Sequence, residues 1–347
     1  MSMQTLLGID YPIIQAPMAG VQGSALAVAV SSAGGLGSLP CAMLDVNGIR
    51  AELAAIRAQT DRPFNVNFFC HAEPKPDAER DLIWRVSLAP YFVEYGLDAS
   101  AIQAGPGRSP FNAEMADVLE EFKPAVVSFH FGLPSSDLMA RVRATGAKIL
   151  SSATTVEEAR WLEAQGVDAV IAQGFEAGGH RGMFLSDDVS TQVGTLALVP
   201  QIVANVTIPV IAAGGIADAK GIAAAMALGA AGVQIGTAYL LCPEATTSPL
   251  HRAALKSDRA RVTALTNVFT GRPARGIVNR IVRELGPMSA AAPAFPLALP
   301  AVLPLRAKAE SLGRDDFTPL WAGQNASGCR EISAAELTRE LGESTRR

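Results

Sequence analysis

Long uninterrupted apolar runs are missing from this sequence, although 49% of its 347 residues are hydrophobic. No run reaches the roughly 18 apolar residues that a membrane helix requires. The first residues, Met-Ser-Met-Gln-Thr, also lack the basic and apolar regions of a signal peptide. We therefore expect a cytoplasmic protein with no membrane partner, whose hydrophobic residues form a sizeable core.

Cysteine, histidine and excess basic charge are scarce as well. The four cysteines lie far apart from one another, the four histidines are scattered, and the sequence shows no metal-ligand spacing and no Cys-x-x-Cys pair. We expect reduced thiols and no metal site. The net charge of −4 and the lack of a basic patch predict that nucleic acid is not a partner.

Short runs rich in β-forming residues alternate with alanine-rich stretches, which is typical of parallel strands joined by helices. We expect eight strands at residues 11–18, 35–39, 64–68, 125–129, 148–152, 168–172, 208–213 and 232–236. Eight strand–helix repeats predict an α/β protein with a (β/α)8 TIM barrel. An open doubly wound sheet is the alternative, but its Gly-x-Gly-x-x-Gly signature after the first strand is missing.

The regular alternation stops after residue 241, which suggests a division into domains. We expect a barrel at residues 1–241 and an inserted helical cap or substrate domain at 242–330, with helices near 249–259 and 277–285. Ser333, followed three residues later by Glu336, predicts the start of a last helix. Residues 331–347 would return this helix to the barrel. The irregular stretch 71–110 is expected to be an excursion of the third strand–helix connection.

The stretch from Val170 to Gly182 carries the strongest functional signal. A buried strand at residues 168–172 stops at Gln173-Gly174 and is followed by a glycine-rich loop with Gly178, Gly179 and His180. Paired glycines allow the backbone to approach a flat or phosphorylated ligand. Histidine is the side chain whose unperturbed pKa suits proton transfer near neutrality. We therefore take His180 as the candidate catalytic residue; the alternative is a tight turn with a surface histidine.

Ligands of (β/α)8 barrels bind at the C-terminal ends of the strands, so the residues at these ends are candidates. The seventh and eighth strands end in Gly214-Gly215 and in the run from Gln234 to Thr237. Both ends are glycine-rich and precede expected helix starts, where free backbone N–H groups and the helix dipole favour an anion. Together they predict a phosphate site, although either motif alone is also compatible with a tight turn.

Amide side chains at other strand ends indicate a flat heterocycle next to the phosphate. Asn67 and Gln173 each offer a donor and an acceptor, which suits the pyrimidine edge of a flavin, although Asn67 also fits a simple strand end. Ala16, Pro17 and Met18, at the end of the first strand, would supply backbone contacts and apolar packing. A flat, phosphorylated ligand with these partners implies FMN.

These residues belong to segments that resemble the nitronate monooxygenases, formerly called 2-nitropropane dioxygenases, and among them the class I branch. The matching segments are residues 15–20, 33–37, 64–67, 172–182, 213–216, 234–237, 269–276 and 320–324. The resemblance implies an FMN-binding barrel that oxidises alkyl nitronates, such as propionate 3-nitronate, with O2 to carbonyl compounds and nitrite. It also implies that Gln324 reaches the flavin and that His180 is the active-site histidine.

The candidate residues can therefore be collected in two groups. The cofactor-binding candidates are Ala16, Pro17, Met18, Asn67, Gln173, Gly178, Gly179, Gly214, Gly215, Gln234, Ile235, Gly236, Thr237 and Gln324. His130, at the exit of the fourth strand, is either a substrate contact or a structural histidine. Arg272 and Arg275 can attract an anion, but ordinary ion pairs are the favoured interpretation.

Several alternatives stay open. His180 can serve as a charged donor if it is protonated or as a base if it is neutral. An NAD(P)H-dependent reductase of quinones or enoyl thioesters would use the same barrel, although related NADH:quinone reductases place a lysine where this chain has Ser151-Ser152. A binding module without turnover is a third possibility. The expected partners are a small nitronate and O2, and the chain is expected to be a monomer or a homodimer.

Overall fold

The computed structural model describes residues 2–102 and 108–346. Eight parallel strands follow one another in the order β1-β9-β8-β6-β5-β4-β3-β2. An isolated parallel bridge between Ile14 and Leu36 joins the two outer strands, so the sheet closes into a barrel. The strands are β1 (Ile13–Gln15), β2 (Gly37–Pro40), β3 (Phe64–Phe69), β4 (Val126–His130), β5 (Lys148–Ala153), β6 (Ala169–Gln173), β8 (Val210–Ala213) and β9 (Gly232–Ile235). The prediction of a TIM barrel is confirmed.

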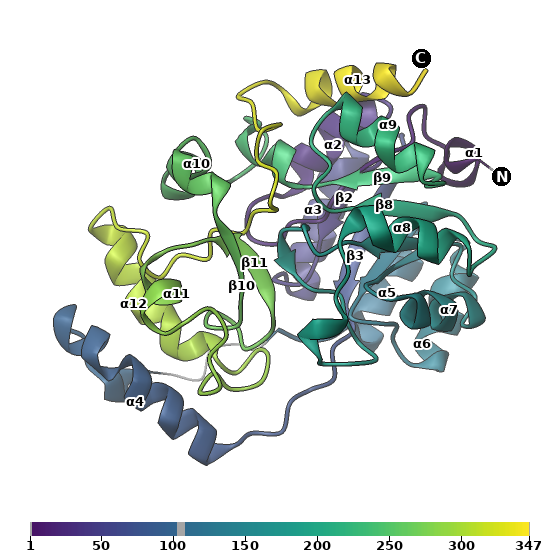
Figure 1. Cartoon of the computed structure of the whole chain (residues 1–347). Helices are drawn as coiled ribbons and strands as arrows, with labels where there is room; N and C mark the ends of the chain where they lie inside the picture. The colour runs from purple at the N-terminus through teal and green to yellow at the C-terminus, as the bar shows by residue number, and fades with distance from the viewer. Residues whose placement is uncertain (1, 103–107, 347) are drawn as a thin grey trace.

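Helices cover the outside of the barrel (Figure 1). They are α2 (Ser24–Ser32), α3 (Val46–Arg57), α5 (Ala113–Phe122), α6 (Ser136–Ala144), α7 (Val156–Ala164), α8 (Thr195–Val203), α9 (Ala219–Ala227) and α13 (Ala334–Glu343). Polar side chains fix several of their starts; the Asp45 carboxylate, for example, accepts a hydrogen bond from the Gly48 N–H at 2.7 Å. Helix α6 is missing from the sequence-based expectation because it buries only Met139 and Val142, which is too few to reveal a helical period.

The chain end returns to the barrel as the predicted helix. The Ser333 hydroxyl accepts a hydrogen bond from the Glu336 N–H at 3.1 Å, and α13 then buries Leu337 and Leu341 in the core that lies between the strands and the outer helices. The short helix α1 (Met3–Leu7) buries Met3 among residues that point into the barrel. Both ends of the described chain are thus fixed to the barrel by apolar packing.

The remaining elements form a second packed body beside the barrel (Figure 1). They are α4 (Ala78–Glu94), α10 (Pro249–Leu255), β10 (Thr263–Thr266), β11 (Ala274–Ile277), α11 (Arg280–Glu284) and α12 (Leu299–Ser311). Helix α4 comes from the third strand–helix connection and packs against α12, where its Trp84 and Leu88 share a core with Val302 and Leu305. Residues 103–107 of the expected excursion lie outside the described residues.

The expectation of a purely helical cap needs one correction. β10 and β11 pair antiparallel, and β11 also pairs with β7 (Gly179–His180), which belongs to the glycine-rich loop of the barrel. Each strand is short, and β11 runs almost directly into α11, so the sequence pattern suggests one continuous helix near 277–285. The loop with His180 is therefore an edge strand of the second body.

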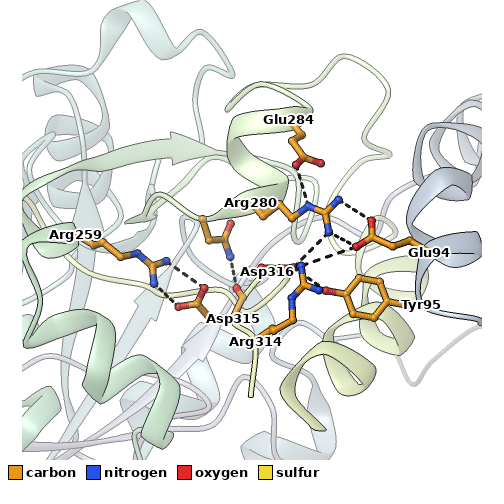
Figure 2. A network of polar contacts seen from close by, with 9 residues as sticks. Glu94, Tyr95, Arg259, Arg280, Glu284, Arg314, Asp315 and Asp316 are labelled. Carbon is orange, nitrogen blue, oxygen red and sulfur yellow. Dashed lines mark hydrogen bonds and ion pairs between the residues drawn. The ribbon is translucent and has the colours of Figure 1, made fainter. Parts of the chain in front are cut away.

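Charged side chains fasten α4 to this second body (Figure 2). The Arg280 guanidinium donates to both carboxylate oxygens of Glu94, at 2.7 Å each, and to Glu284 at 2.9 Å. The Tyr95 hydroxyl donates to Asp316 at 2.7 Å, and Arg314 forms an ion pair with the same carboxylate at 2.6 Å. Because several charges share one network, it gives α4 a more definite position than isolated surface pairs would.

Within residues 2–102 and 108–346, no helix is both long enough and apolar enough to cross a membrane.

Candidate active site

A cavity lies at the C-terminal ends of the barrel strands, between the barrel and the second body, with an empty volume of about 1270 Å³ when its open mouth is included. Most of the predicted site residues line it: Ala16, Pro17, Met18, Asn67, His130, Gln173, Gly178, Gly179, His180, Gly214, Gly215, Gln234, Gly236 and Thr237. The structure thus brings together residues from six strand ends at one site.

Two predicted cofactor contacts do not line this cavity. The side chain of Ile235 is buried in the core outside the barrel strands, because successive side chains of a strand point to opposite faces. Gln324 is exposed, and its backbone N–H donates to the Glu176 carbonyl at 2.9 Å. Its neighbours Gly323 and Asn325 line the cavity instead, so the segment reaches the site one residue away from the predicted position.

The loop that carries His180 is held by side-chain hydrogen bonds. The Gln173 amide donates to the His180 carbonyl at 3.0 Å and accepts from the Gly182 N–H at 2.7 Å. The buried guanidinium of Arg181 donates to the carbonyls of Gly174 and Gln173 at 2.6 and 2.7 Å. The Gln173 amide, which was expected to contact the ligand, is therefore engaged in fixing the loop beside the cavity.

His180 is buried among aromatic rings with one ring nitrogen free. Its Nε2 lies 2.9 Å from the Thr270 hydroxyl, and no residue of the described ranges makes a hydrogen bond with Nδ1. The rings of Phe295 and Trp321 lie 5.3 and 5.6 Å away. Burial lowers the pKa of His180 well below its usual range, and the nearby Arg108 cation lowers it further. The imidazole is therefore neutral at pH 7.

His130 lines the cavity, but both of its ring nitrogens are engaged. Nε2 lies 3.2 Å from the His180 carbonyl and Nδ1 lies 2.5 Å from the Ser152 hydroxyl. Since a carbonyl only accepts, Nε2 carries the hydrogen and Nδ1 accepts from Ser152. Burial lowers the pKa of His130 to about 3. Of the two interpretations given above, this geometry favours a structural histidine that supports the backbone of His180.

The glycine-rich ends of β8 and β9 present a group of unpaired N–H groups. In the part of the chain that the structure describes, no hydrogen bond engages the backbone N–H groups of Gly214, Gly215, Gly236 and Thr237. Gly214 and Gly215 have φ values of +113° and +73°, a conformation that other residues rarely adopt. Unpaired backbone N–H groups in such a concave turn favour an anion.

The surroundings of these N–H groups differ from the prediction of two adjacent α-helix starts. Helix α9 begins only at Ala219, and the Asp218 carboxylate already accepts from the Gly221 N–H at 2.8 Å. β9 is followed by a short 3-10 helix, η3 (Thr237–Leu241), rather than by an α-helix. The correction is that the unpaired N–H groups lie in the loop after β8 and at the start of a 3-10 helix after β9, and not at the starts of two α-helices.

Two polar atoms at the cavity wall are buried without a partner. Gln234 Oε1 and His251 Nε2 make no hydrogen bond with any described residue, and both side chains line the cavity. The amide nitrogen of Asn67 donates to the Ser128 hydroxyl at 2.9 Å, which directs its oxygen away from that contact. A buried polar atom without a partner is destabilising, so a ligand with N–H or O–H donors fits this wall. The residues present therefore fit the predicted flavin.

Three arginines near the loop of His180 form no direct ion pair with a described residue; Arg108 lines the cavity, while Asp187 and Glu158 act on Arg272, and Glu176 acts on Arg275, only from a longer distance. Among the described residues, no Asp or Glu oxygen lies within ion-pair distance of Arg108, Arg272 or Arg275. Arg272 lies 4.0 Å from the centre of the Phe131 ring, and Arg275 lies 4.7 Å from that of Phe175. The favoured interpretation of Arg272 and Arg275 as ordinary ion pairs is therefore wrong, because both guanidiniums stack on aromatic rings instead.

Some cavity residues were not predicted from the sequence. They are Phe69, Arg108, Ser152, His251, Trp321 and Asn325. Trp321 and Asn325 lie in or next to a segment that carries the family resemblance, so proximity to Gln324 was a usable signal. Arg108 and His251 belong to no recognisable motif, and only the packing of the second body against the barrel brings them to the site. The described residues contain no group of three or more His, Cys, Asp or Glu side chains that could hold a metal ion.

Comparisons with known proteins agree with this site. Residues 1–344 match a family model described as nitronate monooxygenase. A nitronate monooxygenase from Pseudomonas aeruginosa is 46% identical over 98% of this chain and 98% of the relative. One from Paraburkholderia phytofirmans is also 46% identical, over 97% of this chain and 92% of the relative.

A solved structure extends the similarity to the fold. The nitroalkane oxidase from Streptomyces ansochromogenes has a TM-score of 0.89 and 40% sequence identity, covering 100% of this chain and 99% of that chain. The sequence match over nearly the full length and the shared fold lead to one conclusion. The chain is an enzyme that belongs to the nitronate monooxygenase family.

Proposed function

We propose that this enzyme uses FMN to oxidise alkyl nitronates with O2 to carbonyl compounds and nitrite. One observation carries the proposal: a single cavity combines a cradle of unpaired N–H groups, an unpaired amide oxygen and a neutral histidine close to the Arg108 guanidinium, which has no ion-pair partner among the described residues. The cradle and the amide suit a phosphorylated flavin, and the Arg108 guanidinium suits an anionic substrate. The family membership supports the same reaction.

The chain offers a complete set of contacts for FMN. Gly214, Gly215 and the segment Gly236–Thr237 would hold the phosphate through their N–H groups. Gln234 Oε1 would accept a hydrogen bond from the pyrimidine ring, and Met18 would pack against the apolar part. When bound, FMN would supply the redox chemistry by taking electrons from the nitronate.

The remaining task of the protein is to hold the anion in a water-poor environment. The guanidiniums of Arg108 and Arg272 raise the electrostatic potential of the cavity, which attracts an anionic nitronate. The aromatic rings around His180 exclude water and strengthen each charged contact. Arg108 also gives a second anionic group, such as the carboxylate of propionate 3-nitronate, a partner at the cavity wall.

The proposal is tested in two steps. Heat release and chromatography of the cofactor should yield FMN, and the finding of FAD or of no flavin would contradict the proposal. Oxygen uptake and nitrite release should then be measured with propionate 3-nitronate, beside a sample that receives NADH instead. Rapid loss of flavin absorbance with NADH alone, without nitronate turnover, would favour the alternative of an NAD(P)H-dependent reductase.

We further propose a detoxifying role in the cytoplasm for this enzyme, because alkyl nitronates are reactive anions. The boundaries at residues 1–241, 242–330 and 331–347 stay a prediction, as does the monomeric or homodimeric state. Size-exclusion chromatography with light scattering would decide the oligomeric state. Removal of residues 242–330 should cost both flavin retention and solubility, because Trp84 and Leu88 of α4 lose the core they share with this segment.

A further inference from the structure

Thr270 lies next to Nε2 of the His180 imidazole, in a loop that is held by hydrogen bonds. It belongs to the loop between β10 and β11 and is 2% exposed. The next residue, Gly271, has a φ of +88°, and its N–H donates to the Asn267 carbonyl at 2.8 Å. The Asn267 amide in turn donates to the Ser289 carbonyl at 2.9 Å. These contacts fix the position of the Thr270 hydroxyl.

The hydroxyl of Thr270 has one hydrogen-bond partner in the described ranges, His180 Nε2 at 2.9 Å. A buried hydroxyl hydrogen needs an acceptor, and Nε2 is the acceptor within reach. If Thr270 donates to Nε2, that nitrogen carries no hydrogen. The neutral imidazole must then carry its hydrogen on Nδ1, the nitrogen without a protein partner.

The surroundings of His180 keep the ring neutral, so the choice of tautomer decides its chemistry. The charged or titratable groups that act on it are Arg108, Arg272, His71 and His130, which all oppose a positive charge on the ring. Neither Asp nor Glu appears among these groups. The imidazole therefore presents either an N–H donor or a lone pair at Nδ1, and not a cation.

We propose that Thr270 is a positioning residue that holds His180 in the Nδ1–H tautomer, so that His180 donates a hydrogen bond into the cavity instead of acting as a base. This inference deepens the proposed function and rests on it where the substrate is concerned. An N–H donor stabilises the oxygens of a bound nitronate. It cannot remove the α-proton of a neutral nitroalkane, because Nδ1 has no free lone pair in this tautomer. The enzyme should thus strongly prefer the preformed anion.

The tautomer can be observed without any turnover. The intact protein, with its cofactor as purified, is labelled with ¹⁵N-histidine and its four histidines are recorded by NMR near neutral pH. His180→Asn identifies the His180 signals by their loss. The parent protein should show a hydrogen-bearing Nδ1 and a hydrogen-free Nε2 for His180. The opposite pattern would overturn the proposal.

Two variants of Thr270 test whether this residue is the cause. Thr270→Val keeps the shape but removes the hydroxyl, so the Nδ1–H pattern should be lost or mixed with the other tautomer. Thr270→Ser retains the hydroxyl and should restore the parent pattern. If Thr270→Val leaves the pattern unchanged, Thr270 does not set the tautomer and the inference is wrong. A melting measurement of both variants shows whether either one has lost its fold.

Kinetics with two forms of one substrate provide the functional readout. For Thr270→Val, we expect a change in the ratio of kcat/KM for the preformed nitronate to kcat/KM for the neutral nitroalkane. This ratio should fall about tenfold, which corresponds to one weakened hydrogen bond. Thr270→Ser should restore the parent ratio, and an unchanged ratio in Thr270→Val would contradict the role. If the parent oxidises no nitronate at all, the proposed function fails, while the NMR result still decides the tautomer.

Discussion

Gly178→Ala should separate the catalytic loop from the second body and thereby damage the site without removing any chemical group. An ideal Cβ at residue 178 would lie 2.5 Å from the backbone nitrogen of Gly323 and 2.6 Å from the carbonyl carbon of Ala322. Non-bonded heavy atoms prefer about 3.5 Å, so the two backbone segments must move apart by about 1 Å. Backbone atoms cannot yield as a flexible side chain would.

The expected size of the effect follows from this displacement. Overpacking of this kind costs roughly 1–3 kcal/mol of folding free energy, and a shift of about 1 Å near reacting groups costs on the order of 10²-fold in rate. We expect Gly178→Ala to fold with a lower melting temperature, to retain less flavin and to oxidise nitronate far more slowly. Flavin absorbance per protein, nitrite release and thermal melting measure these three quantities.

Gly286→Ala is the matched control for a general loss of stability. Gly286 has a φ of +76°, and a Cβ there would meet no atom within 4 Å. The left-handed conformation alone costs a non-glycine residue about 1–2 kcal/mol, so this variant should melt earlier but keep its flavin and its activity. Full flavin content and parent activity in Gly178→Ala would refute the argument that the two segments depend on this close contact.

Three further predictions concern charge and protonation. His180→Phe removes the ring N–H donor and should still bind FMN, while nitronate oxidation measured by nitrite release falls roughly 10²–10³-fold, as for the loss of one preorganised donor; parent activity would show that His180 is structural. Burial lowers the pKa of His251 from 6.5 to about 4, so the folded protein takes up a proton at His251 less readily than the unfolded chain does. The free energy of unfolding therefore falls as the pH falls below 6.5, by about 2 kcal/mol at pH 5. Between pH 7 and pH 5, the melting temperature should therefore decrease less for His251→Gln than for the parent. Equal decreases in the two proteins would contradict this prediction. Arg108→Gln should raise KM about tenfold for a nitronate that carries a carboxylate, and much less for a nitronate with an uncharged alkyl chain. Equal increases in KM for both substrates would exclude a contact between Arg108 and the carboxylate.

The barrel was predictable from sequence because its signals are local and periodic. Each strand is a short β-rich run, and each helix that was predicted begins near a capping residue such as Asp45 or buries a regular apolar face. The cavity residues at the strand ends followed from one general property of such barrels, that their ligands bind at the C-terminal ends. Glycine pairs and amide residues at those ends were therefore recognisable from the sequence alone.

The second body and its contribution to the site were not predictable in the same way. β10 and β11 pair across a loop of seven residues and have only four residues each, so no period-2 pattern reveals them. The neutral state of His180 depends on burial and on Arg108, which is distant in sequence. The role of the Gln173 amide depends on where the loop folds back, and a residue type alone cannot show which partner it has.

The pairing of β7 with β11 has a consequence for the order in which the protein folds during synthesis. All barrel strands have been translated once residue 235 is made, yet Gly179 and His180 pair with Ala274 and Arg275, and Gly178 packs against Gly323. A nascent chain with a complete set of barrel strands thus lacks the contacts that hold the loop of His180. Contacts between such distant residues form late, because the loop between them must first close. The candidate site is therefore completed only after the segment around Gly323 has left the ribosome and forms its part of the cavity wall.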